Sequence, residues 1–122
     1  MGRVLGIGGV FYRCEDPEGV RDWYRRVLGV QWSQWGSADF APRDQAMTVL
    51  SPFKADTDYF APSTAAFMIN LAVEDLDGLL KQAKAQGVEP LGRQDESYGK
   101  FAWLMDPQGI KIELWEPGEM PA

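Results

Sequence analysis

The sequence predicts an α+β fold made from two copies of a βαβββ unit, and an internal repeat is the main reason. Cys14–Val20 (CEDPEGV) recurs 59 residues later as Val73–Leu79 (VEDLDGL). Leu28–Gln31 is echoed by Gln86–Glu89 at an offset of 58 residues. Repeats at a fixed offset are typical of duplicated supersecondary units that bury a shared core. Both ends of a predicted helix match, which argues against chance similarity.

The length and composition agree with one domain that contains both units. The chain has 122 residues, of which 45% are hydrophobic and 25% charged, as expected for a folded globule. We expect a single domain over residues 1–122, with units 4–53 and 65–117 joined by a linker at 51–64. No apolar stretch approaches the ~20 residues that cross a bilayer, and no signal peptide is apparent. With Cys14 as the single cysteine, a cytoplasmic location is expected.

Each unit has a helix with a recognisable start and end. Asp16 and Asp75 are suited to N-caps, because a carboxylate accepts from the free amides of the first turn. Pro17 fits the first helical position, where a missing N–H costs nothing. Gly29 and Gly87 are suited to end the helices in the left-handed conformation. Apolar residues at helical spacing follow both caps.

Strands are predicted on both sides of each helix. In the first unit they are Val4–Cys14, Val30–Trp35, the surroundings of Phe40, and Met47–Leu50. In the second unit they are Ala66–Val73, Val88–Gly92, Phe101–Met105 and Ile110–Trp115, with a tight turn at Asp106–Gly109. The linker is expected to cross the surface with its aromatic residues held against the core, and a lid over a ligand site is the less favoured alternative.

Side-chain alternation divides the last strands into two faces. Ile110, Ile112 and Leu114 point toward the helices, whereas Lys111, Glu113 and Trp115 point away. On the preceding strand Phe101, Trp103 and Met105 share one face, and Met68 and Asn70 share a face of the strand before the second helix. The sheet away from the helices therefore forms an aromatic cup with a few polar groups, as in small-molecule sites. A dimer interface explains these aromatic residues equally well.

Two counts restrict the chemistry. The chain contains no histidine, which excludes Ser-His-Asp and Cys-His mechanisms and removes the commonest ligand of zinc, iron and nickel. The formal net charge of −6 argues against a nucleic-acid partner.

The sequence resembles the glyoxalase / bleomycin-resistance / extradiol-dioxygenase (vicinal oxygen chelate) superfamily along nearly its whole length. The resemblance is carried by Asp22–Gly29 (DWYRRVLG), by Val73–Asp77 (VEDLD), and above all by Asp106–Pro117 (DPQGIKIELWEP). It implies a cup-shaped antiparallel sheet with the helices on its outer face. The Asp106–Pro117 segment is specific for the superfamily and not for one reaction within it.

The enzymes of this superfamily usually hold a divalent metal at four equivalent strand positions. The resemblance places these positions at Gly9, Thr48, Met68 and Glu113, of which only Glu113 binds a metal well. One carboxylate is too few, since a catalytic zinc takes about three protein ligands. A divalent metal is therefore disfavoured, and no other cofactor is expected. Glu113 then acts as a general base, binds a cationic group, or is a leftover position that is solvated or salt-bridged.

Three functions remain open. The first is a protein that binds a small organic molecule in the cup without the metal, with Glu113 at its centre. Its ligand-binding candidates are Phe11, Thr48, Met68, Asn70, Trp103 and Trp115. The second is an active lyase, isomerase or dioxygenase that uses Glu113 as metal ligand or general base. The third is a non-catalytic interaction dimer. A homodimer is expected in any case, with no nucleic-acid or membrane partner.

Overall fold

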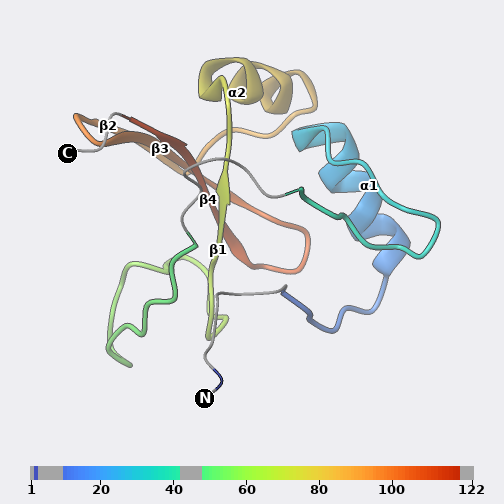
Figure 1. The fold of residues 1–122 in the computed structure, drawn as a ribbon, viewed down its shortest axis with the longest axis horizontal. Coiled ribbons are helices and arrows are strands. Elements are labelled where there is room, and N and C mark those ends of the chain that lie inside the picture. The colour runs from blue at the N-terminus through green and yellow to red at the C-terminus, as the bar shows by residue number, and fades with distance from the viewer. Residues whose placement is uncertain (1, 3–9, 42–47, 119–122) are drawn as a thin grey trace.

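The computed structural model describes residues 2, 10–41 and 48–118. Its elements in chain order are α1 (Pro17–Leu28), β1 (Ile69–Ala72), α2 (Leu76–Ala85), β2 (Gly92–Glu96), β3 (Gly99–Met105) and β4 (Lys111–Pro117). The two helices lie to one side of a four-stranded sheet (Figure 1). The predicted α+β class is confirmed, and the predicted order βαβββ is seen from β1 to β4.

The sheet has the strand order β1-β4-β3-β2. Its β2–β3 and β3–β4 pairs are antiparallel, as predicted, but β1 and β4 run parallel. Parallel strands need a long crossover connection, and here α2 and the β2–β3 hairpin supply it. The sheet is therefore mixed, and β4 lies in its interior with a neighbour on each side.

The predicted helix signals are confirmed at the caps. The Asp16 carboxylate accepts from the amide of Gly19 at 3.1 Å, and α1 ends at Gly29, whose φ of 70° lies in the left-handed region. The Asp75 carboxylate caps α2 in the same way. Gln86 is the C-cap of α2, and Gly87 follows it in the left-handed region with a φ of 81°, as predicted. Among the described residues, no helix is long and apolar enough to cross a membrane.

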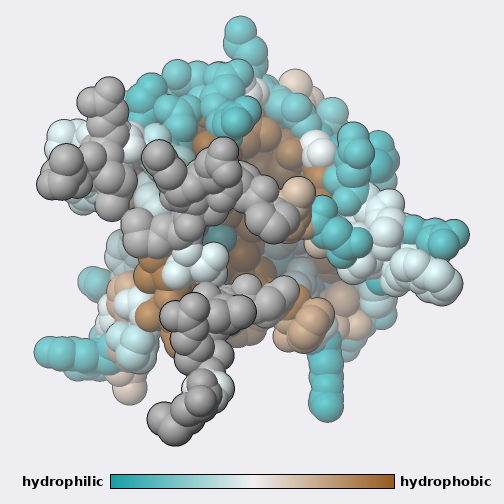
Figure 2. Space-filling model, viewed as in Figure 1, coloured by the Kyte–Doolittle hydropathy of each residue, from teal (hydrophilic) through white to brown (hydrophobic). Residues whose placement is uncertain are grey.

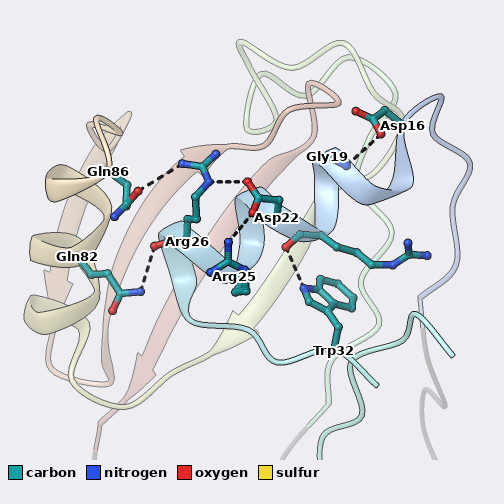
Figure 3. A network of polar contacts seen from close by, with 9 residues as sticks. Asp16, Gly19, Asp22, Arg25, Arg26, Trp32, Gln82 and Gln86 are labelled. Carbon is teal, nitrogen blue, oxygen red and sulfur yellow. Dashed lines mark hydrogen bonds and ion pairs between the residues drawn. The ribbon is translucent and has the colours of Figure 1, made fainter. Parts of the chain in front are cut away.

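Polar contacts join the two helices on their outer side (Figure 3). Gln82 Nε2 donates to the carbonyl of Arg26 at 3.3 Å, and Arg26 Nη1 donates to Gln86 Oε1 at 3.4 Å. Asp22 accepts from both Arg25 and Arg26 on α1 itself. These exposed contacts order the helix surface but contribute little to stability, because water and salt screen them.

The core lies between the helices and one face of the sheet. Its buried apolar members are Val20, Tyr24, Val27, Leu28, Leu76, Ala83, Ala102, Leu104, Ile110, Ile112 and Leu114. Alternation along β3 and β4 sends their neighbours in sequence to the opposite face. Figure 2 shows hydrophobic residues gathered toward the middle of the visible surface, with hydrophilic residues around the margin.

Several strands predicted for unit 4–53 are wrong. Residues 10–14, 30–35, 40 and 48–50 are not in strands, whereas residues 4–9 and Met47 lie outside the described residues. A turn interrupts the segment at 30–35, where the amide of Ser33 donates to the carbonyl of Ser37 and Gly36 has a φ of 85°. Trp32 Nε1 donates to the carbonyl of Arg21 at 2.9 Å. The segment is therefore bound to α1, and its tryptophan does not extend a sheet.

The strand predicted at 88–92 is also displaced. The amide of Val88 donates to the carbonyl of Ala83 at 2.9 Å, which ties this residue to the end of α2. Strand β2 instead covers Gly92–Glu96, a polar and largely exposed segment at the edge of the sheet. Its pairing rests on backbone hydrogen bonds to β3, and a hydrophobic pattern does not report these.

Candidate functional site

Glu113 lies in β4 on the face that points away from the helices. Its neighbours Ile112 and Leu114 are fully buried in the core, and Glu113 itself is 8% exposed. In the sheet register Glu113 is aligned with Asn70 of β1 on one side and with Trp103 of β3 on the other. Side chains at such aligned positions lie about 5 Å apart at Cβ and reach one another directly.

Three side chains donate hydrogen bonds to the Glu113 carboxylate. Asn70 Nδ2 donates to Oε1 at 2.7 Å, and Trp103 Nε1 donates to Oε2 at 2.8 Å. The hydroxyl of Tyr59, from the linker 51–64, also donates to Oε2. A buried carboxylate is costly unless it is hydrogen-bonded, and these three bonds offset that cost.

Lys111 holds the linker residue in place. Its Nζ donates to the backbone carbonyl of Tyr59 at 2.6 Å. The same ammonium lies 5.2 Å from the centre of the Tyr59 ring and 5.6 Å from that of Trp103, within the range of cation–π attraction. Lys111 therefore interacts with both aromatic residues that contact Glu113.

Aromatic rings surround the carboxylate on the same face. Phe101 stacks with Trp103 at 6.5 Å between ring centres and with Trp115 at 6.4 Å. The ring of Tyr59 meets Trp103 edge-on at 6.3 Å. We call Phe101, Trp103 and Trp115 the aromatic row. It provides a flat apolar surface beside a single buried negative charge.

The Tyr59 hydroxyl is held in its protonated form. Burial and, after it, the hydrogen bond to Glu113 together raise the pKa of Tyr59 to about 12. A phenolate beside a carboxylate is disfavoured by like charge. Tyr59 therefore serves as a neutral hydrogen-bond donor over the whole physiological range of pH.

Trp115, at one end of the aromatic row, has an unusual environment. Its Nε1 is buried and has no hydrogen-bond partner among the described residues. A Cβ atom at Gly99 would lie 2.7 Å from this nitrogen. A side chain at Gly99 would collide with the indole, so the position of Trp115 depends on that glycine.

The structure brings together four of the residues predicted for the site. Glu113, Asn70, Trp103 and Trp115 lie on one face of adjacent strands, as alternation indicated. Met68 is half-buried just before β1 and Thr48 is exposed, with no polar contact to Glu113. Phe11 is 95% exposed and does not join the aromatic row. Gly9 lies outside the described residues.

The residues around Glu113 do not fit a divalent metal. Within the described part of the chain there is no group of three or more aspartate, glutamate, cysteine or histidine side chains that could hold one. An indole N–H carries no lone pair for a metal, and Trp103 presents this group to Oε2 at 2.8 Å. The carboxylate is thus surrounded by donors where a metal would need further acceptors.

Tyr59 is the site residue that sequence reasoning missed. It belongs to the linker, whose aromatic residues Phe53, Tyr59 and Phe60 were expected to contact the core, with a lid over a ligand site as the less favoured alternative. Phe53 stacks on Tyr59 at 5.6 Å and meets Phe60 at 5.2 Å. Three aromatic residues in one short linker were the only sequence signal for this contact. The linker has no helix or strand periodicity that would have identified Glu113 as the partner of Tyr59.

Solved structures similar to this chain include proteins of the same fold. TioX from Micromonospora sp. ML1 aligns with 16% identity over 87% of this chain and 91% of its own, with a TM-score of 0.50. A conserved domain protein aligns with 16% identity over 81% and 87%, with a TM-score of 0.51. These two likenesses concern the fold alone.

A third similarity covers less of the chain. The glyoxalase / bleomycin resistance protein from Catenulispora Acidiphila DSM 44928 is 33% identical over 44% of this chain, with a TM-score of 0.37. The aligned part spans 47% of that protein. No curated protein matches the sequence.

Sequence comparison with protein families gives a match over most of the chain. Residues 9–115 match the family described as the glyoxalase-like domain. The match includes both helices and the strands that carry Asn70, Trp103 and Glu113. With its α+β fold, the chain belongs to the glyoxalase-like domain family.

Proposed function

We propose that this glyoxalase-like protein binds a small organic molecule at the aromatic row beside Glu113, without a divalent metal. The observation that carries the proposal is the buried Glu113 carboxylate, 8% exposed, with donors from β1, from β3 and from the linker. A polar group of this kind on an apolar sheet face is suited to orient a hydrogen-bonding ligand.

The aromatic row supports an organic ligand over an inorganic one. Trp103 neighbours Phe101 along β3 and Trp115 is aligned with Phe101 on β4, with interplanar angles of 13° and 2° between the rings. Parallel rings offer a flat apolar surface to which another planar molecule can add by offset stacking. Sites of this kind combine mostly apolar walls with a few polar groups that orient the ligand.

The donors around Glu113 support binding without a metal. Asn70, Trp103 and Tyr59 compensate the carboxylate by hydrogen bonds, and a bound cation would compete with the N–H of Trp103 for Oε2. The alternative is an enzyme of the superfamily that holds a metal at Glu113 or uses this residue as a general base. Metal content separates the metal-dependent form of that alternative from the proposal.

The test combines metal analysis with ligand binding. The protein is purified without chelators and examined by elemental analysis, and we expect no stoichiometric zinc, iron, nickel or manganese. It is then titrated with indole and quinoline while tryptophan fluorescence and thermal unfolding are followed. A probe at ten times its Kd should stabilise the folded state by about 1.4 kcal/mol. A stoichiometric metal that is lost in Glu113→Gln would contradict the proposal.

Two variants locate the binding. Trp115→Ala removes one end of the aromatic row and should weaken binding of both probes. Glu96→Gln is the matched control, because Glu96 lies on the exposed edge strand β2 and accepts from Gln94. Unchanged binding in Trp115→Ala, or equal loss in both variants, would place the probes elsewhere on the protein.

We also propose that two copies of this chain associate. Large hydrophobic residues of the first half are exposed in the single chain, namely Val10, Phe11, Trp35, Phe40, Val49 and Leu50. Segments 30–35 and 48–50 were predicted as strands and are not paired within the described chain. Unpaired apolar segments of this type are covered by another chain. Light scattering after size exclusion should give twice the monomer mass. Leu50→Asp should lower this molar mass toward that of the monomer. A monomeric mass at all protein concentrations would refute the proposed association.

A further inference from the structure

Access to Glu113 is closed by the protein itself. Glu113 as a whole residue is 8% exposed, although its face of the sheet is not covered by either helix. Tyr59 makes the cover: its hydroxyl donates to Oε2, and its ring stands edge-on to Trp103. A ligand that hydrogen-bonds to Oε2 therefore has to take the place of Tyr59.

The three donors to Glu113 are not equivalent. Asn70 and Trp103 belong to β1 and β3 and are fixed by the sheet register on both sides of Glu113. Tyr59 belongs to a segment without helix or strand, and its own side chain is 37% exposed. Segments with exposed backbone and few buried contacts open at the lowest free energy. Tyr59 is the donor that can leave.

The contacts of the linker with the sheet are few. Lys111 Nζ donates to the carbonyl of Tyr59 at 2.6 Å, and Ser63 Oγ donates to the carbonyl of Gly109 at 2.5 Å. The ring of Phe53 stacks on Tyr59 and meets Phe60, and Phe53 is 47% exposed. Movement of these linker rings together would keep the contacts among them while Tyr59 leaves Glu113.

We infer that Tyr59 is an internal occupant of the ligand site, and that the ligand is a planar aromatic molecule with one neutral hydrogen-bond donor at its edge. This inference rests on the proposed function and adds the ligand class and the way it enters. The ligand donor replaces the Tyr59 hydroxyl at Oε2, and its ring replaces the Tyr59 ring against Trp103. A phenol, an aniline or an indole meets these requirements.

The charges at the site restrict the ligand further. Lys111 Nζ lies 5.2 Å from the centre of the Tyr59 ring, so a ring in the same place faces this ammonium. Cation–π attraction favours an electron-rich ring. An anionic ligand is opposed by the negative charge of the Glu113 carboxylate, because like charges repel at close range.

The test uses the side chain of tyrosine as a separate molecule. p-Cresol is titrated into wild type and Tyr59→Ala, and binding is followed by tryptophan fluorescence and by calorimetry. Toluene is the matched probe without a donor, and Phe11→Ala, which removes an exposed ring outside the aromatic row, is the control variant. We expect p-cresol to bind Tyr59→Ala at least tenfold more tightly than wild type or Phe11→Ala. In Tyr59→Ala it should bind at least tenfold more tightly than toluene, because a hydrogen bond to a carboxylate contributes that much.

The outcomes separate the inference from the proposed function. Equal or weaker binding of p-cresol to Tyr59→Ala than to wild type would show that Tyr59 lines the site and does not occupy it, while the proposed function stands. Equal binding of p-cresol and toluene to Tyr59→Ala would refute the role of the donor. If neither protein binds p-cresol, indole or quinoline, the proposed function fails as well.

A second variant keeps the test valid if Tyr59→Ala does not fold. Tyr59→Phe retains the ring and its packing on Phe53 but loses the hydrogen bond to Oε2, so the ligand displaces this ring at a lower cost. It should bind p-cresol more tightly than wild type, and addition of Glu113→Gln should reduce its preference for p-cresol over toluene. No gain of affinity in folded Tyr59→Phe would overturn the inference.

Discussion

Replacement of Tyr59 by Phe tests whether the hydrogen bond to Glu113 stabilises the folded chain. The substitution removes one hydroxyl and retains a ring that stacks on Phe53. A hydrogen bond to a charged group contributes roughly 1.5–3 kcal/mol when it is buried. Tyr59 is 37% exposed, so water replaces part of the lost bond. We therefore expect a loss of about 1–1.5 kcal/mol in the free energy of unfolding.

Urea denaturation measures this loss. For a domain of this size the expected shift of the midpoint is about 0.5–1 M toward lower urea. Tyr98→Phe is the control: Tyr98 is 52% exposed, and its change should stay within about 0.5 kcal/mol. A double-mutant cycle with Glu113→Gln isolates the pair. A Tyr59→Phe protein as stable as wild type, or a cycle without coupling, would refute the reasoning.

The same bond should make stability depend on alkaline pH. The pKa of Tyr59 is raised in the folded state from 10.0 to about 12. A raised pKa means that the protonated phenol is the form favoured by folding, so its contribution is complete below pH 10. It is lost as the pH rises from 10 to 12. The difference in stability between wild type and Tyr59→Phe should shrink over this interval, and a constant difference would contradict the assignment.

Three further substitutions test other parts of the structure. Gly99→Ala places a Cβ atom 2.7 Å from Trp115 Nε1; it should cost about 1–3 kcal/mol and change the tryptophan fluorescence, and a loss below about 0.5 kcal/mol would contradict the packing. Tyr24→Phe removes a buried hydroxyl that donates to Asp106 at 2.8 Å; it should lower the free energy of unfolding by about 1.5–3 kcal/mol, and an unchanged urea midpoint would argue against this bond. Asp16→Ala removes the N-cap of α1 and should lower the free energy of unfolding by about 0.5–2 kcal/mol. The thermal midpoint should fall accordingly, and an unchanged midpoint would show that the cap does not stabilise the helix.

The helices could be predicted because their signals are local. Asp16, Pro17 and Gly29 act on the backbone within one turn of their own positions, so the sequence pattern contains the whole interaction. The alternation along β4 was predictable for the same reason. It placed Glu113 and Trp115 on the face opposite Ile112 without knowledge of any neighbouring strand.

The pairing of strands could not be predicted from such patterns. The parallel alignment of Asn70 with Glu113 depends on β4 entering the sheet between β1 and β3. The polar strand β2 is paired through its backbone, so its side chains carry no periodic signal. The contact of Tyr59 with Glu113 joins residues 54 positions apart through a linker without regular structure. A rule based on residue spacing cannot predict this contact between Tyr59 and Glu113.

The choice between a metal and an organic ligand depends on the neighbours of Glu113 more than on Glu113 itself. A buried carboxylate requires compensation, and either a cation or several hydrogen-bond donors can provide it. These two solutions compete at the same oxygen, because a donor directs a partial positive charge toward the region that the cation would occupy. Trp103 is the decisive neighbour, since its indole N–H is a donor in every protonation state, and it lies 2.8 Å from Oε2. Asn70 can rotate to present an oxygen, and Tyr59 can leave with the linker, but Trp103 is fixed in β3 beside Glu113. While Trp103 holds this position, the Glu113 carboxylate favours a neutral hydrogen-bond donor of a ligand over a metal ion.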